Sequence, residues 1–156
     1  MEEHRSDGSI SFRYLKESIG SLMFLWYRLD DALSDALLGR KNKAPPRLGG
    51  SFHDRLVKLK ALADREHASD PTSAAKMYDL LTELDHVRRQ RNLIVHSLAG
   101  VCADPAKGEP HLTCEKEEGR VRITQTELSA MLETMDRCRQ QLEELECPND
   151  LARKQS

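Results

Sequence analysis

The sequence has few aromatic residues and no apolar run long enough to cross a membrane. Phe, Tyr and Trp make up 4% of its 156 residues and charged residues 32%, a balance that suits a helical protein better than a β-sandwich. A membrane span needs about 20 apolar residues, but the run at 22–27 ends at Arg28. Residues 1–5 are polar and acidic, unlike a signal peptide. We therefore expect a cytoplasmic protein without a membrane segment.

An excess of positive charge and clustered metal ligands are also missing. Lys and Arg number 24 against 26 Asp and Glu, which excludes a bulk basic surface for nucleic acid. Contact with RNA would therefore require a local patch. The cysteines form no C-x-x-C pair, and no histidine lies at zinc-ligand spacing from two of them. We predict free thiols and neither a metal nor a cofactor; the cysteines are Cys102, Cys114, Cys138 and Cys147.

The sequence does contain helical periodicity, which first predicts a helix over about 12–38. Its apolar residues recur at steps of three and four, so they share one helical face. Gly39 is a natural stop. Residues 1–11, rich in charge, Ser and Gly, are expected to be flexible. The apolar stripe consists of Leu15, Ile19, Leu22, Trp26, Leu29, Leu33 and Leu37.

Capping-box pairs predict the starts of the second and the last helix. Ser51 and Asp54 form one pair, after a loop at 40–50 with four basic residues; Thr124 and Glu127 form the other. The second helix is expected to bury Phe52, Leu56, Leu59 and either Leu62 or Ala63. The last helix is expected to end at Pro148, with a stripe of Leu128, Met131, Met135, Cys138, Leu142 and Leu145.

Between the third and the last helix, the sequence predicts a loop at 102–110 and then a short β-hairpin. Residues 111–115 and 120–124 alternate in character around a turn at 116–119. We therefore predict an all-α fold, an antiparallel four-helix bundle with this hairpin as an insert between helices three and four. All 156 residues are expected to form one domain, with a flexible tail at 149–156.

The third helix is expected to begin with Asp70 as N-cap and Pro71 at its first position, and to end at Leu98 or Ala99. Arg91 lies on its apolar stripe. A buried guanidinium is costly unless an anion meets it, so the protein must supply a partner or leave Arg91 to a ligand. The stripe consists of Leu80, Leu84, Val87, Ile94 and Leu98.

Residues 91–96, RNLIVH, resemble the R-x4-6-H motif of HEPN domains, in which a polar residue, often Asn, follows the arginine. The motif lies at the end of a helix near the middle of a small four-helix protein, and the resemblance in architecture spans roughly 12–146. Leu98 stands where one toxin branch of the family carries a tyrosine. The resemblance therefore does not imply regulation through that tyrosine.

The resemblance implies a metal-independent endoribonuclease that acts as a homodimer, with the motif helices facing one another. His96 would act as general base toward a ribose 2′-OH, or as acid toward the leaving 5′-oxygen. Arg91 would hold the scissile phosphate, and Asn92 would hydrogen-bond the substrate or orient the other two. Arg88 and Arg89 could add phosphate contacts. The family also implies a toxin–antitoxin or phage-defence role, with an antitoxin or nucleotidyltransferase partner.

The spacing of Arg91 and His96 places a condition on this site. Five residues on an ideal helix turn about 140° and rise about 7.5 Å, so the two side chains do not share a face. They could converge if Arg91 reaches along the axis, if the helix loosens near Val95, or if each pairs across a two-fold axis. The last option fits a dimer with a shared active site.

Each motif residue also has a structural interpretation. His96 could cap the helix C-terminus, where positive charge is favourable. Asn92 could serve a local hydrogen bond, and Arg88 and Arg89 could form a solvated face. Arg91 could pair within the protein with one of Asp30, Asp31, Glu83 and Asp85.

Two other functions remain open from the sequence. One is a non-catalytic HEPN-like bundle that serves as a dimeric protein- or nucleotide-binding module. The other is a plain helical adaptor in which the motif match is accidental. For the remaining polar and aromatic candidates we expect structural roles only. We expect His53, His67, His86 and His111 on the surface and Asp30 and Asp31 in salt bridges. Phe24, Trp26 and Tyr27 are at the spacing of core residues.

Overall fold

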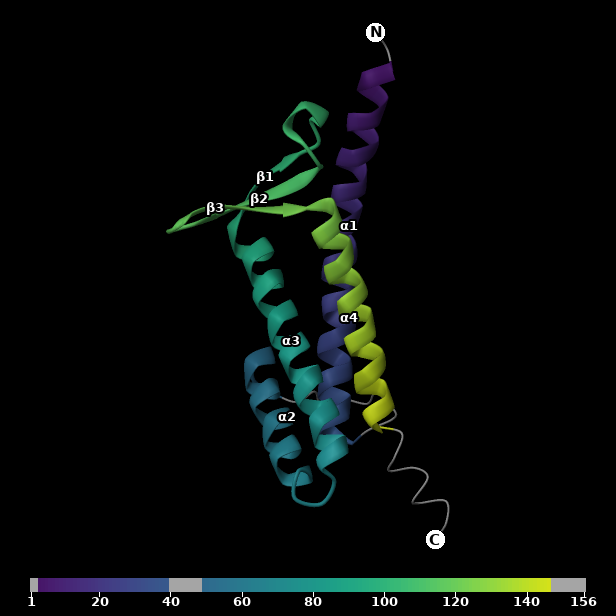
Figure 1. Cartoon of the computed structure of the whole chain (residues 1–156), viewed down its shortest axis with the longest axis vertical. Coiled ribbons are helices and arrows are strands. Elements are labelled where there is room, and N and C mark those ends of the chain that lie inside the picture. Colours follow the sequence, from purple (N-terminus) through teal and green to yellow (C-terminus); the bar gives the residue numbers. More distant parts are fainter. Residues whose placement is uncertain (1–2, 40–48, 147–156) are drawn as a thin grey trace. The chain divides into compact units, whose positions relative to one another are not determined.

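The computed structural model describes residues 3–39 and 49–146, and these segments are mostly helical, with a small antiparallel sheet (Figure 1). This confirms the helical fold and the strand insert after the third helix. Along the chain the elements are α1 (Glu3–Leu38), α2 (Phe52–Glu66), α3 (Pro71–Ser97), β1 (Leu98–Cys102), the 3-10 turn η1 (Pro105–Lys107), β2 (His111–Lys116), β3 (Gly119–Thr124) and α4 (Gln125–Glu146). The predictions for the basic loop at 40–48, Cys147, the helix end at Pro148 and the tail fall outside the described residues.

Helix α1 begins at Glu3, well before the predicted start near Phe12. No proline interrupts this stretch, and a helix nucleated by its apolar stripe gains one hydrogen bond for each further residue. The helix ends at Leu38, and Gly39 follows with a φ of 61°, as a C-terminal glycine should. The deepest residues of the predicted stripe are buried, namely Leu15, Leu22, Leu29 and Leu33.

Both predicted capping boxes are present. The Ser51 hydroxyl accepts the backbone N–H of Asp54 at 3.1 Å, and the Asp54 carboxylate accepts the backbone N–H of Ser51 at 2.7 Å. At the start of α4, Thr124 and Glu127 exchange the same two bonds at 3.2 and 2.8 Å. These bonds satisfy N–H groups that have no partner inside the helix, so they determine where α2 and α4 begin.

Helix α3 begins as predicted but ends earlier. Asp70 accepts the backbone N–H of Ser73 at 3.0 Å, and Pro71 opens the helix. The helix ends at Ser97, because the residues expected to continue it form strand β1 instead. Leu98, predicted on the buried helical stripe, is 40% exposed and pairs with Cys114 of β2. Pairing with a distant strand overrides the local helical pattern here.

The predicted hairpin is confirmed as β2 and β3, joined through residues 117–118. Gly119 follows this turn with a φ of 129°, a conformation that a side chain would strain. The sequence did not predict β1, which pairs antiparallel with β2 to give the strand order β1-β2-β3. Part of the expected loop at 102–110 is therefore strand, and part is the 3-10 turn η1.

The described residues form two compact units, and α1, α3 and α4 each contribute to both. The sheet unit contains α1 up to Leu25 together with Arg89–Glu133. Within this unit the Tyr14 and Ser129 hydroxyls share a hydrogen bond of 2.9 Å, which joins α1 to α4. The buried apolar residues are Leu15, Leu22, Ile94, Leu112, Cys114, Ile123, Leu128 and Met131.

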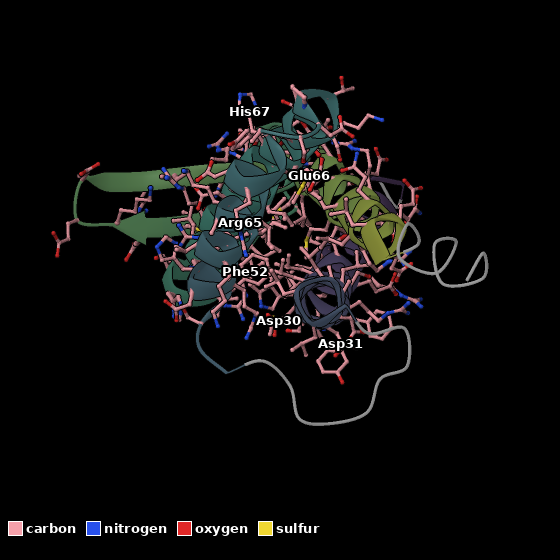
Figure 2. The ribbon with its side chains drawn as sticks, turned by 90° about the horizontal axis from the view of Figure 1, so that it is seen from below. Asp30, Asp31, Phe52, Arg65, Glu66 and His67 are labelled. Atoms are coloured by element: carbon pink, nitrogen blue, oxygen red, sulfur yellow. The ribbon has the colours of Figure 1, made fainter. Side chains whose placement is uncertain are left out.

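Of the described residues, the helical unit contains 26–39, 49–88 and 134–146. The Trp26 and Phe52 rings pack at a centroid distance of 4.4 Å, which joins α1 to α2. The buried guanidinium of Arg55 donates to the Asp30 carboxylate and, at 3.0 Å, to the Gly50 carbonyl. Figure 2 labels Asp30 on α1 and Phe52 on α2, in the region where these two helices approach each other. The predicted salt bridge of Asp30 is therefore confirmed.

Two of the three aromatic residues expected in the core of α1 are on its surface. Phe24 and Tyr27 are 60% and 52% exposed, whereas Trp26 is half-buried. Helical spacing alone does not say how wide the buried face is, and α1 buries a narrow stripe. No helix within residues 3–39 and 49–146 is both long enough and apolar enough to cross a membrane.

Candidate functional site

The candidate site occupies the last two turns of α3 and the start of β1, all within the sheet unit. Val87 and Ile94 are buried on the inner side of the helix, and Arg91 between them is half-buried, with its Nε atom enclosed. The Nη1 atom of Arg91 donates a hydrogen bond of 3.2 Å to Oδ1 of Asn92. The aliphatic stem of Arg91 therefore lies on the apolar stripe, and Asn92 bonds one side of its guanidinium.

The bond from Arg91 also determines how the Asn92 amide is turned. A guanidinium can only donate hydrogen bonds, so the atom facing it must be the amide oxygen. The amide nitrogen Nδ2, with its two donors, then points away from Arg91. Asn92 is half-buried.

His96 is exposed and is the second residue from the end of α3. It follows Asn92 by four positions, which on a helix means about 40° of rotation and 6 Å of rise. Asn92 and His96 therefore lie on the same side of α3. The exposure of His96 argues against an imidazole enclosed by apolar side chains. Its place in the last turn leaves the helix-capping interpretation open.

Helix α3 stays α-helical through Val95 and up to Ser97. Loosening of the helix, one of the three ways to bring Arg91 and His96 together, is therefore not observed. Within one chain the structure brings Arg91 to Asn92 and aligns Asn92 with His96. It leaves Arg91 and His96 pointing in directions about 140° apart.

The chain changes from helix to strand immediately after His96. Leu98 pairs with Cys114 but Gly100 pairs with Thr113, so Ala99 is an extra residue that bulges from β1. Such bulges bend a strand and re-aim its side chains. Val95 and Leu98, on either side of His96, are 39% and 40% exposed. An apolar surface therefore lies next to the candidate site.

The two arginines considered as further phosphate contacts differ in their surroundings. Arg88 belongs to the helical unit and donates to Asp85 through Nε and Nη2 at 3.0 and 2.8 Å. Arg89 belongs to the sheet unit and is exposed. The ion pair within α3 gives Arg88 a structural role.

Three of the carboxylates considered as internal partners for Arg91 bond other groups. Asp30 pairs with Arg55, Asp85 pairs with Arg88, and Glu83 accepts from Arg137 at 2.8 Å. Glu83 also accepts a weak hydrogen bond from the Cys138 thiol at 3.5 Å. Arg91 itself donates to Asn92.

The cysteines that the structure describes are free thiols, as predicted: Cys102 is half-buried, and Cys114 and Cys138 are buried. Burial and the nearby Glu83 carboxylate raise the pKa of Cys138 to about 12. Among the described residues no three His, Cys, Asp or Glu side chains gather as metal ligands would. His53, His67 and His86 are exposed as expected.

His111 was predicted on the surface, but it is only 4% exposed. It lies on β2, the central strand of the sheet, so its side chain is flanked on both sides. The sequence did not reveal this, and it also missed β1, the strand that pairs with β2 beside His111.

Comparison of the chain with protein-family models, with curated proteins and with solved structures found no match.

Proposed function

We propose that this protein is a HEPN-type endoribonuclease that cleaves RNA at a site made by Arg91, Asn92 and His96. The observation that carries the proposal is the arrangement of Asn92. Its amide oxygen accepts from Arg91 at 3.2 Å, and Asn92 precedes the exposed His96 by four positions, about one turn of α3. Arg91, Asn92 and His96 thus place a cation, a neutral donor and an imidazole within the last two turns of α3.

Each side chain has a role that its chemistry supports. His96 takes the proton of a ribose 2′-OH, whose oxygen then attacks the adjacent phosphorus. The O2′–P bond forms and the P–O5′ bond breaks, which leaves a 2′,3′-cyclic phosphate and a 5′-OH once the leaving oxygen is protonated. Arg91 offsets the charge that grows on the phosphate oxygens, and Asn92 donates to one of them. The 2′-OH is the nucleophile, so the proposed reaction needs no metal.

The proposal includes a homodimer in which the two α3 helices meet. Arg91 and His96 point in different directions on a regular helix, so the proposed site combines Arg91 of one copy with His96 of the other. A two-fold axis would supply two such sites at once. The exposed Val95 and Leu98 beside His96 offer apolar surface for that contact.

The rest of the proposal concerns the whole chain. We take α1 to α4 as an antiparallel four-helix bundle that forms one cytoplasmic domain. In the helical unit, contacts between successive helices support this arrangement: Arg55 with Asp30, Tyr78 with Asp64, and Arg137 with Glu83. A toxin or phage-defence role, restrained by an antitoxin or nucleotidyltransferase partner, would suit such an enzyme.

The test is RNA cleavage in EDTA by the wild type, His96→Ala and a matched control, His86→Ala. His86 is also an exposed histidine of α3, so its removal should leave cleavage unchanged. We expect single-stranded RNA to be cut by the wild type and the control, with 2′,3′-cyclic phosphate ends, and not by His96→Ala. Equal cleavage by all three proteins, or none at any concentration, would overturn the proposal.

The second candidate is a non-catalytic dimeric module that binds a protein or a nucleotide. The apolar surface around His96 favours it, because Val95 and Leu98 would serve a protein contact without any chemistry. A dimer that withstands His96→Ala and never cleaves RNA is the result that would select this candidate.

A further inference from the structure

Strand β3 forms one edge of the sheet, and part of its main chain faces away from the other strands. The strand order is β1-β2-β3, so β3 pairs with β2 on one side only. At its end, Thr124 lies opposite His111 of β2, yet its backbone N–H is donated to the Glu127 carboxylate at 2.8 Å. The N–H of Thr124 therefore points away from β2.

The same direction applies to the arginines two and four residues before Thr124. Successive residues of a strand turn their N–H and C=O groups toward opposite edges, so Arg122 and Arg120 present theirs on the side away from β2. Within residues 3–39 and 49–146, neither arginine makes a main-chain hydrogen bond outside the β2–β3 pair. Both residues are exposed. Each therefore offers one donor and one acceptor to a further strand.

The two faces of β3 differ in character. Side chains alternate along a strand, so Arg120 and Arg122 project from one face and Val121 and Ile123 from the other. Ile123 is buried, whereas Val121, nearer the turn, is half-buried. A strand added beside β3 would set alternate side chains next to the arginines and next to Val121. Acidic side chains match the first face and apolar ones the second.

Charge decides which strand fits this edge. Arg120 already donates to an acidic neighbour, Glu115 of β2, at 3.1 Å. Arg122 makes no ion pair within the part of the chain that the structure describes. If β3 of a second copy paired with this edge, arginine would lie opposite arginine, and like charges directly opposed are destabilising. The edge therefore favours an acidic strand over a second copy of itself.

Nucleic acid fits the edge less well than an acidic peptide does. The β2–β3 hairpin carries three acidic and three basic side chains: Glu115, Glu117, Glu118, Lys116, Arg120 and Arg122. Without a net positive charge it lacks the field that attracts a polyphosphate. A peptide gains main-chain hydrogen bonds along the strand as well as the local charge pairs. Figure 1 shows the turn of this hairpin extending beyond the end of α3.

We propose that β3 is a docking edge for an extended acidic segment of another protein, which adds to the sheet as a further strand. The segment alternates acidic and apolar side chains. Its acidic residues lie beside Arg120 and Arg122, an apolar residue between them covers Val121, and its main chain bonds the outward groups of the two arginines. No residue of the proposed catalytic site takes part, so the inference does not depend on RNA cleavage.

The first test compares two short synthetic peptides, one that alternates valine with glutamate and one that alternates valine with lysine. Amide hydrogen exchange of the protein, followed by NMR, reports each backbone N–H separately. We expect the glutamate peptide at millimolar concentration to slow exchange at Arg120 and Arg122, and the lysine peptide to leave it unchanged. Equal protection by both peptides, or protection by neither, would overturn the proposal.

The second test reverses one charge on the edge. We expect Arg122→Glu to weaken binding of the glutamate peptide about fivefold and to bind the lysine peptide more tightly than the wild type does. Arg65→Glu is the matched control, since Arg65 is an exposed arginine on α2, and both affinities should stay unchanged. Fluorescence anisotropy of labelled peptides measures binding, and circular dichroism checks the fold. Equal affinities of the wild type and folded Arg122→Glu would contradict the role of Arg122. If this variant does not fold, the two peptides on the wild type decide.

The third test separates a peptide site from a nucleic-acid site. Single-stranded DNA serves as the competitor, because it carries the same phosphates as RNA but has no 2′-OH to be cleaved. We expect it not to displace the labelled glutamate peptide from the wild type. Displacement of the peptide by DNA would assign the edge to polyphosphate and overturn the choice of an acidic peptide.

Discussion

In the penultimate turn of α3, the Arg91 guanidinium donates from Nη1 to the Oδ1 atom of Asn92, 3.2 Å away. Adjacent residues on a helix point about 100° apart, so this bond draws the guanidinium toward the side that faces solvent. The aliphatic stem of Arg91 thus lies on the apolar stripe, between the buried Val87 and Ile94.

Replacing Asn92 should separate its structural role from its role toward a substrate. Asn92→Ala removes both the contact with Arg91 and the amide donor, and we expect RNA cleavage to fall about 100-fold. Asn92→Asp keeps an acceptor for Arg91 but replaces the donor by a carboxylate that repels phosphate. We expect Asn92→Asp to cleave even more slowly than Asn92→Ala while it unfolds at the same urea concentration as the wild type or a higher one. Single-turnover cleavage and urea titrations measure the two effects. Wild-type cleavage by Asn92→Asp would show that the amide donor is not used.

A charge in the apolar surface beside His96 should disrupt the proposed dimer. We expect Val95→Lys to sediment as a monomer and to lose RNA cleavage, because a lysine would have to be desolvated at the contact between two α3 helices. Val57→Lys is the matched control, since Val57 is an exposed valine on α2. Analytical ultracentrifugation gives the oligomeric state. A dimer that persists in Val95→Lys would place the contact elsewhere.

Removing Asp30 should destabilise the protein more than removing another carboxylate of α1. Asp30→Ala leaves the Arg55 guanidinium, whose side chain is 9% exposed, without its carboxylate, and we expect a loss of about 3 kcal/mol in unfolding free energy. Glu17→Ala breaks a well-exposed pair with Arg13 on the same helix and should cost less than about 0.5 kcal/mol. Urea denaturation of both variants gives the comparison. Equal losses would mean that the Arg55–Asp30 pair is not effectively buried.

The bond between Tyr78 and Asp64 should stabilise α2 against α3 only within a window of pH. The Tyr78 hydroxyl donates to the Asp64 carboxylate, which lowers the pKa of Asp64 from 3.8 and raises the pKa of Tyr78 from 10.0. The contribution of Asp64 is present above its ordinary pKa and is lost as the pH falls through the lowered one. The contribution of Tyr78 is present below its ordinary pKa and is lost as the pH rises through the raised one.

The difference in unfolding midpoint between the wild type and Tyr78→Phe should therefore be constant near neutral pH and shrink toward both extremes. Urea titrations monitored by circular dichroism over a series of pH values measure it. A difference that does not change with pH would mean that the phenol contributes through packing and not through its hydroxyl.

Features encoded by a few neighbouring residues could be predicted. The capping boxes at Ser51 and Thr124, the start of α3 at Pro71 and the β2–β3 hairpin were all correctly placed. Each depends on hydrogen bonds or backbone preferences within about four residues, so the local sequence contains the whole signal. That Arg91 and Asn92 are neighbours on α3 could be predicted for the same reason, because they are consecutive in the sequence.

Features that depend on distant pairing were missed. Leu98 continues the helical pattern of α3, yet it pairs with Cys114 as a strand residue. His111 resembles a surface histidine until β1 covers it, and Phe24 has core spacing on a helix that buries only a narrow face. For Leu98 the deciding partner lies in β2, beyond the η1 turn.

The sequence by itself determined the helices, their caps, the hairpin and the order of Arg91, Asn92 and His96 along α3. Helical periodicity and capping depend on residues only a few positions apart, so the local sequence is enough to predict them. Only the tertiary structure decided that α3 ends at Ser97 and Leu98 joins a strand, that His111 is buried, and that Cys102 pairs opposite His111. These outcomes follow from burial and strand register, which bring together residues that no local pattern connects.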